Sequence, residues 1–347
     1  MSDSKAKKKI ILFTIGNIDH PSSRIRGVQY IPYLEKAGFK VVWVPRIPKK
    51  AKNSLDRYFF YPLRKRIYSL HRLFHIIFSK PDYFFIQKIF LPKWQLQLLN
   101  KRNIPFVYDF DDAIYLDQKN SSAKDNTLNS IQLADKVIVS NSILADFCKN
   151  NNVKAHIITT PIDIDRIHEK KEYKIEGKFR IGWMGSFWTT KYIEIVEPAL
   201  KELSKKHNFK LILIGADKQF RIEGIDIEHK NWAFNKEEEH LHEFDIGIMP
   251  LTSDQYSEAK GGYKLLMYMA AGIPQIASPV GINADIVQVN QTGFLANNTN
   301  EWIEAIEFFI QNREKCSIFG KASRKEAEFK YSRDICFEKM ASLLGTP

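Results

Sequence analysis

The stretch Ser257–Gly281, SEAKGGYKLLMYMAAGIPQIASPVG, decides the fold of this chain. A Gly-Gly turn at Gly261 and Gly262 opens a predicted helix, because apolar residues then recur at helical spacing until Gly272 ends the pattern. A short strand pattern at residues 275–278 follows at once. A helix that leads directly into a strand is typical of an α/β domain, so the stretch predicts the α/β class.

The same turn places main-chain N–H groups at a helix N-terminus. These groups have no intrahelical partners and lie at the positive end of the helix dipole, so they can hold a phosphate without side-chain charge. Lys260 and Lys264 lie on either side of the turn and would add positive charge. The residues alone leave a second interpretation open, a capped helix with two solvated lysines.

Length and composition point to a two-domain globular protein. The 347 residues exceed one typical core, and 44% hydrophobic residues with 13% aromatics suffice for two. The three cysteines are far apart and form no CxxC pair, which indicates neither a disulfide framework nor a zinc site and fits a reducing cytosol. We expect no membrane-spanning helix, since no run of about 18 uncharged apolar residues occurs. We interpret the basic amino terminus as a tail that enters the first strand.

A strand–helix–strand pattern occurs once in each half of the chain. It covers residues 9–15, 21–38 and 41–44, and again residues 179–185, 191–207 and 210–215. Such units pair their strands in parallel through a right-handed crossover, and open sheets of this kind bind ligands beyond the carboxyl ends of the strands. We therefore expect Gly16, Ser23, Arg24 and Arg26 at the edge of a ligand site, with an N-cap and two solvated arginines as the alternative.

Several segments resemble the retaining GT-B glycosyltransferases of family 4, also called glycosyl transferases group 1. The likeness is carried by Asp245–Pro250, the lysine-flanked Gly261-Gly262, Leu265–Pro274, Ala277–Gly281, Gly293–Ala296, Glu301-Trp302, Ser22–Arg26 and Ile157–Asp163. It covers most of the chain except about residues 46–80. It implies the GT-B fold, with two Rossmann-like domains that face a cleft. The implied parts are an acceptor-side domain at 1–165, a nucleotide-sugar-binding domain at 179–330, and a helix at 331–347 that packs back on the first domain.

The resemblance also implies an activity. It predicts transfer of a sugar from a nucleotide-diphosphate donor to a saccharide or lipid-linked saccharide, with retention, in the synthesis of bacterial-type surface glycans or glycoconjugates. No cofactor or metal is expected, since main-chain N–H groups and lysines can stabilise the departing diphosphate. The expected location is the cytoplasm, free or peripheral on the membrane. Two alternatives stay open: a non-catalytic GT-B-like protein that binds a nucleotide or saccharide, and a nucleotide-sugar epimerase of the same fold.

The resemblance assigns roles to individual residues. Those implied to bind the donor are Gly16, Gly185, Ser186, Lys191, Glu258, Lys260, Gly261, Gly262, Tyr263 and Lys264. Those implied to act in catalysis are Asp111, Asp112 and Lys191, and those on the acceptor side are Ser23, Arg24 and Arg26.

The donor side departs from the family pattern at three positions. Ser186 stands where the family often has an arginine on the donor diphosphate, so more of that role falls to Lys191. Ala259 and Met267 stand where the family has two glutamates, one for the donor sugar and one for the ribose. Glu258 is one residue from the first of these and can replace it if the loop is shifted.

The acidic strand end at Asp109–Asp112 has two interpretations. Asp109-Phe-Asp111 matches the Asp-x-Asp metal motif of the GT-A fold, and hard divalent cations do prefer such ligands. The surrounding chain resembles GT-B instead, where this strand commonly ends in His-Asp. Asp111 then takes the place of the histidine, which makes Asp111 or Asp112 a candidate for contacting sugar hydroxyls.

Residues 46–80 carry much of the formal net charge of +12, with ten Lys or Arg against one acid, Asp56. An apolar helical stripe runs through the segment at Leu63, Ile67, Leu70, Phe74 and Ile77. A basic amphipathic helix of this kind lies on an anionic bilayer surface, or packs on a sheet with its basic face in solvent. We expect no nucleic-acid binding, because neither an aromatic-plus-basic motif nor zinc-finger spacing is present.

Overall fold

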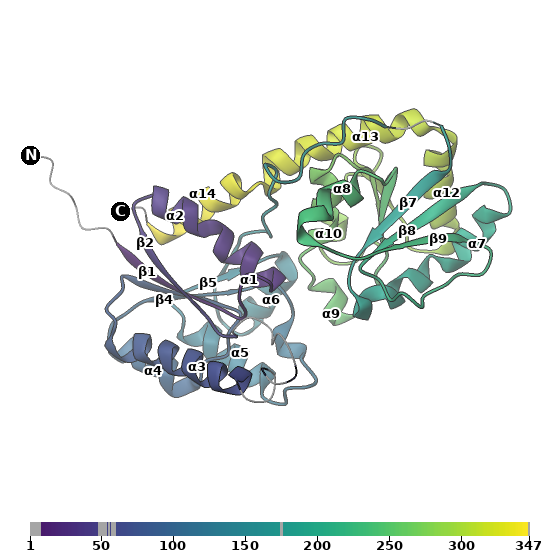
Figure 1. Cartoon of the computed structure of the whole chain (residues 1–347). Helices are drawn as coiled ribbons and strands as arrows, with labels where there is room; N and C mark the ends of the chain where they lie inside the picture. Colours follow the sequence, from purple (N-terminus) through teal and green to yellow (C-terminus); the bar gives the residue numbers. More distant parts are fainter. Residues whose placement is uncertain (1–7, 48–53, 55, 57–59, 174–175, 346–347) are drawn as a thin grey trace, which may run out of the picture. The chain divides into compact units, whose positions relative to one another are not determined.

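The computed structural model describes residues 8–47, 54, 56, 60–173 and 176–345 (Figure 1). The chain forms two compact units, Met1–Pro161 with Cys336–Pro347 and Ile162–Ile335, here called the first and second unit. Each is built on one six-stranded parallel sheet, which confirms the predicted α/β class. Part of the basic segment discussed above, residues 48–53, 55 and 57–59, lies outside the described residues. No helix in the described part of the chain is long and apolar enough to cross a bilayer.

The first sheet consists of near-continuous apolar strands, as a sheet covered on both faces requires. Its strands are β1 (Lys9–Thr14), β2 (Lys40–Pro45), β3 (Tyr83–Gln87), β4 (Phe106–Phe110), β5 (Lys136–Val139) and β6 (Ala155–Ile157), in the order β2-β1-β3-β4-β5-β6. β2 lies on one side of β1 in the sheet, and β3, the next strand along the chain, lies on the other side of β1. The topological switch point, where α/β sheets bind ligands, therefore lies between β1 and β3.

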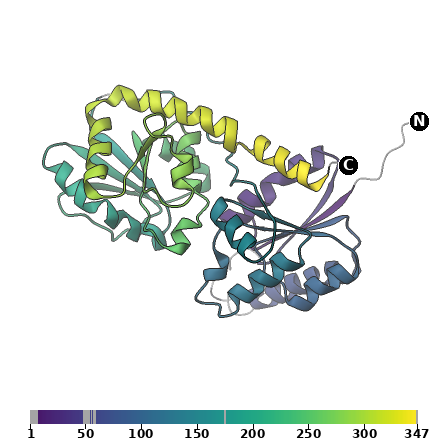
Figure 2. The ribbon, with the colours of Figure 1, turned by 180° about the vertical axis from the view of Figure 1, so that it is seen from behind.

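Helices cover both faces of the first sheet (Figures 1 and 2). They are α1 (Pro21–Arg26), α2 (Ile31–Lys36), α3 (Tyr61–Phe78), α4 (Lys93–Lys101), α5 (Ala123–Leu133), α6 (Ser142–Asn150) and α14 (Arg333–Leu344), with 3-10 turns at Val28–Tyr30 and Ile114–Leu116. α2 and α14 lie on one face, and α3, α4 and α5 on the other. Cys336, Met340 and Leu344 of α14 are buried in the core cluster that contains Ile10 and Leu12 of β1.

The single helix predicted over residues 21–38 was wrong. The segment breaks into α1, a 3-10 turn and α2, because Gly27 has a non-helical backbone and Pro32 lies in the first turn of α2. A Cβ on Gly27 would lie 2.8 Å from Cγ2 of Thr14, so the chain packs closely on β1 at the break. Periodicity does not reveal such a close approach.

The second sheet repeats this arrangement. Its strands are β7 (Phe179–Met184), β8 (Phe209–Ile214), β9 (Asp226–Lys230), β10 (Ile246–Met249), β11 (Gln275–Ala277) and β12 (Gly293–Leu295), in the order β12-β11-β10-β7-β8-β9. The switch point lies between β7 and β10. The predicted strands at 179–185, 210–215 and 275–278 are confirmed within a residue at either end.

The helices of the second unit also pack on both faces of their sheet. They are α7 (Glu197–Ser204), α8 (Glu237–Leu241), α9 (Gln255–Glu258), α10 (Tyr263–Ala270), α11 (Asn283–Ile286), α12 (Thr299–Gln311) and α13 (Arg313–Glu326), with 3-10 helices at Phe187–Ile195 and Phe234–Lys236 and a π turn at Ala327–Tyr331. The helix predicted over 191–207 was wrong in its first half, which is 3-10. Pro198 in the first turn of α7 has no N–H for a bond to the preceding turn, so the α-helix begins only at Glu197.

Candidate functional site

Gly185 and Ser186 follow β7 directly, at the switch point of the second sheet. A Cβ on Gly185 would lie 2.2 Å from the indole ring of Trp183, so only glycine fits there. The N–H of Ser186 donates to Oγ1 of Thr189 at 3.0 Å, which closes the first turn of the 3-10 helix. Glycine at 185 therefore lets the main chain turn directly against the ring of Trp183.

The Gly261-Gly262 turn opens α10, as the sequence predicted. Gly262 is the N-cap and has a left-handed backbone with φ of 65°, which favours glycine. A Cβ there would also lie 2.4 Å from Cδ1 of Ile286. The N–H of Leu265 donates to the Gly262 carbonyl at 2.9 Å and closes the first turn, and the N-terminus of a helix that begins in this way favours anions.

Lys260 is held on Tyr192. Its Nζ donates to the phenol oxygen of Tyr192 at 3.1 Å and lies 4.2 Å from the ring centroid. The same phenol is 3.2 Å from Oγ of Ser257. Burial raises the pKa of Tyr192, but its hydrogen bonds to Ser257 and Lys260 and the charge of Lys260 outweigh this and leave the pKa lowered. Tyr192 thus ties the 3-10 helix to the segment before α10.

Lys264 lies partly buried in the first turn of α10, with its Nζ 4.3 Å from the ring of Trp183. Burial, followed by the charge of Lys260, lowers the pKa of Lys264 to about 7. Lys191 is exposed on the 3-10 helix, with its Nζ 5.6 Å from the ring of Tyr192. The two aromatic rings, Trp183 and Tyr192, therefore carry three lysines at this edge of the second sheet.

The two positions that carry glutamates in the family are buried and apolar in this chain. Ala259 and Met267 are 0% and 2% exposed, so both sites that carry glutamates in the family are apolar core positions. Glu258 is partly buried at the end of α9 and accepts from Oγ of Ser253 at 3.3 Å. Gly281 lies against it, since a Cβ there would be 2.0 Å from the Glu258 carbonyl oxygen.

In the first unit, Gly16 and Ser23 support one another beyond β1. The N–H of Gly16 donates to Oγ of Ser23 at 2.9 Å, and Ser23 is fully buried. Arg24 is partly buried, and its Nη1 donates to the carbonyl of Ile18 at 3.0 Å. Both side chains thus shape the loop between β1 and α1.

Arg26 lies in the interior of the first unit. It is 2% exposed, its Nε donates to Oδ2 of Asp109 at 3.0 Å, and its Nη1 donates to the carbonyl of Ile158 at 2.9 Å. The structure thus uses Arg26 and Asp109 as a buried ion pair. Asp109, the first carboxylate of the Asp-x-Asp motif, is committed to this pair.

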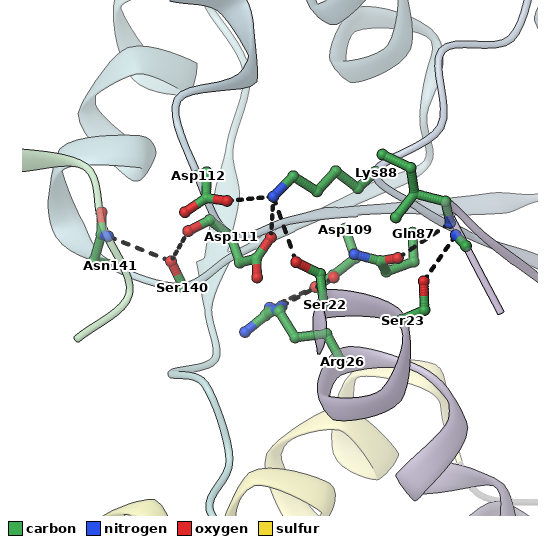
Figure 3. Close-up of polar contacts among 12 residues, drawn as sticks. Ser22, Ser23, Arg26, Gln87, Lys88, Asp109, Asp111, Asp112, Ser140 and Asn141 are labelled. Atoms are coloured by element: carbon green, nitrogen blue, oxygen red, sulfur yellow. Dashed lines mark hydrogen bonds and ion pairs between the residues drawn. The ribbon is translucent and has the colours of Figure 1, made fainter. Parts of the chain in front are cut away.

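Lys88 joins the two remaining carboxylates at the switch point of the first sheet (Figure 3). Its Nζ lies 3.0 Å from Oδ1 of Asp111 and in ion-pair contact with Asp112, and it reaches Oγ of Ser22 at 3.5 Å. Burial disfavours the charged forms of Lys88 and Asp111, but their ion pairing outweighs burial. The pKa of Lys88 is therefore raised, and the pKa of Asp111 is lowered, mainly by the charge of Lys88. Oγ of Ser140, directly after β5, donates to the Asp111 carbonyl at 3.1 Å.

Lys88 was missed as a site residue in the sequence. It follows β3 directly and has φ of 57°, rare for a residue with a Cβ. Its position directly after a strand is a feature of the sequence that could have indicated a site residue. Its contact with Asp111 and Asp112 arises only because β3 and β4 are paired in the sheet, which the sequence does not show. The Asp112 side chain stays 32% exposed, so its carboxylate can accept a hydrogen bond from a hydroxyl group outside the protein.

The chain is similar to known glycosyltransferases in sequence motif and in fold. The family model described as "Glycosyl transferases group 1" matches residues 178–312. No curated protein matches the chain in a sequence search. Sucrose-phosphate synthase from Thermosynechococcus elongatus is 15% identical, with 97% of this chain and 98% of that one covered and a TM-score of 0.74.

Two further solved structures extend this likeness. HepE from Anabaena, in complex with UDP and glucose, is 14% identical over 98% of this chain and 100% of its own, with a TM-score of 0.67. A glycosyltransferase from Rickettsia africae is 15% identical over 98% of both chains, with a TM-score of 0.70. These identities establish the fold, and the family model adds the domain type. Residues 178–312 form a glycosyl transferases group 1 domain, and the chain is a glycosyltransferase with the GT-B fold.

Proposed function

We propose that this glycosyltransferase takes its sugar from a nucleotide-diphosphate donor held by the second unit and needs no metal. The observation that carries the proposal is the Gly261-Gly262 turn, whose helix end lies beside Lys260 and Lys264. Negative charge grows on the diphosphate as the glycosidic bond breaks, and preorganised N–H groups and ammonium groups stabilise it. The complex of HepE with UDP and glucose supports a donor of this class.

On the acceptor side, we propose a saccharide, free or lipid-linked, that is bound by the first unit. Asp112 and Lys88 supply an acceptor and a cation for sugar hydroxyls at the switch point of that sheet. The transfer proceeds with retention, as in the family that the motifs resemble. The product is a surface glycan or glycoconjugate, made in the cytoplasm or on its membrane.

One observation favours a second candidate, a protein that binds the nucleotide sugar without transferring it. Ala259 and Met267 are buried apolar residues where the family has its paired glutamates. A donor site without these carboxylates has lost contacts to the sugar and ribose unless Glu258 replaces one of them. Binding and turnover must therefore be measured separately.

A screen of nucleotide-diphosphate sugars tests both candidates. A bound donor at about 100 times its dissociation constant should raise the melting temperature by roughly 5 °C or more. Release of nucleoside diphosphate with that donor, to water or to a saccharide, shows transfer. Binding without release indicates the binding protein, conversion of the free donor without an acceptor indicates an epimerase, and no binding at all contradicts the donor site.

The charge of Lys264 predicts how donor binding depends on pH. Because its pKa is about 7 in the free protein, Lys264 loses its proton as the pH rises through neutrality. The diphosphate of a nucleotide sugar does not titrate there and favours the charged lysine, so binding takes up a proton. We expect the affinity to fall by about tenfold between about pH 6 and about pH 9, measured by calorimetry.

Two variants separate Lys264 from other groups. Lys264→Arg stays charged and should flatten the pH dependence, whereas Lys264→Met should bind weakly at every pH. Stability gives a second measurement. The folded state holds fewer protons than the unfolded state between about 7 and the ordinary 10.5, so wild-type stability should rise with pH across this window and Lys264→Met should lack that rise. Equal pH dependence in wild type and Lys264→Met would contradict the assignment.

A further inference from the structure

The apolar stripe of α3 is exposed. Leu63, Ile67, Leu70 and Phe74 expose 54%, 52%, 65% and 54% of their surface, and Phe78 at the end of the helix exposes 67%. The helix packs inward through its other side, where His75 and Ile76 are buried. The helix therefore packs on the first sheet, as one interpretation of the sequence had it, but the apolar stripe predicted from periodicity faces away from the core.

The charges on α3 are of one sign. Its 18 residues include four Lys or Arg and no Asp or Glu. Lys65 and Arg66 are exposed, whereas Arg64 pairs with Asp56 at 2.9 Å. By helical spacing, Arg66 lies next to the row of large apolar side chains, whereas the Nζ of Lys65 lies over the Tyr61 ring on another face of the helix.

We propose that α3 docks on an anionic lipid bilayer, with its apolar stripe in the headgroup–acyl boundary and Arg66 against the lipid phosphates. Apolar burial and attraction to anionic lipids both contribute to the binding of such helices. The inference adds a partner to the proposed function, and it does not depend on sugar transfer because binding to vesicles needs neither donor nor acceptor.

The charge argues against a second copy of the chain as the occupant. Two α3 stripes packed together would gather eight cationic side chains from the two helices with no acidic residue on either to pair them. An anionic bilayer offers the opposite charge and an apolar layer at the same surface. Charge and apolarity thus select the bilayer.

Vesicle sedimentation of the full chain tests the proposal. We expect binding to vesicles of equal parts phosphatidylcholine and phosphatidylglycerol, little binding to phosphatidylcholine alone, and weakening by salt, which screens the cations. The double substitution Ile67→Ser/Leu70→Ser should reduce binding by at least about tenfold, since each buried apolar side chain contributes to insertion. Arg66→Glu should reduce binding only to the anionic vesicles.

Ile318→Ser serves as the matched control, because Ile318 on α13 is 56% exposed and lies in the second unit. It should bind vesicles like wild type. Light scattering on the same samples gives the oligomeric state. Absence of wild-type binding to anionic vesicles overturns the proposal, and so does a dimer that Ile67→Ser/Leu70→Ser converts to a monomer. Loss of vesicle binding with nucleotide-sugar turnover intact supports it and leaves the proposed function untouched.

Discussion

Lys191→Ala should lower turnover by about 10²-fold, the scale of losing one preorganised donor to a developing negative charge. Lys191 lies beside Tyr192 on the 3-10 helix that follows β7. β7 is one of the two strands at the switch point of the second sheet. Ser186 stands where the resembled family has an arginine, so no guanidinium at that position shares the role of the Lys191 ammonium group. The measurement is release of nucleoside diphosphate from the donor identified by thermal shift.

Two further variants make this test specific. Lys191→Arg keeps a positive charge and should stay within about tenfold of wild type. Lys321→Ala removes an equally exposed lysine on α13 and should leave turnover unchanged. Because Lys191 is exposed, none of these changes should lower the melting temperature by more than a degree or two. Wild-type turnover in Lys191→Ala would remove Lys191 from the diphosphate site.

Arg26→Met should cost about 3–5 kcal/mol of stability, because it leaves the buried Asp109 carboxylate without its counter-charge. Both side chains are nearly inaccessible, with 2% and 1% of their surface exposed. Urea unfolding followed by circular dichroism measures the loss. The deficit should shrink as the pH falls, since a protonated Asp109 needs no counter-charge.

The double variant Arg26→Met/Asp109→Asn keeps this prediction testable if the single variant does not fold. It removes both charges and should recover most of the lost stability. Arg26 was expected on the acceptor side, and activity tests that expectation separately. A variant that is as stable as wild type but has lost transfer would make Arg26 a contact to the acceptor rather than a structural cation.

The alternation of strands and helices was predictable because it rests on local periodicity. The runs predicted as strands at residues 9–15 and 179–185 form β1 and β7. The failures lie where backbone contacts at longer range decide, as at Gly27, where the chain packs on β1. Local sequence patterns do not predict such contacts.

By itself, the amino-acid sequence determined the α/β class, the glycine turn that opens α10 and the amphipathic character of α3, since each depends on neighbours within a few turns of chain. Only the tertiary structure decided which charges meet. Arg26 and Asp109 are 83 residues apart, and Lys88 reaches Asp111 because β3 and β4 are neighbours in the sheet. It also decided that the stripe of α3 faces outward. Strand order and burial are properties of the whole fold, and hydrophobic spacing, which is the same for a buried and an exposed stripe, does not encode them.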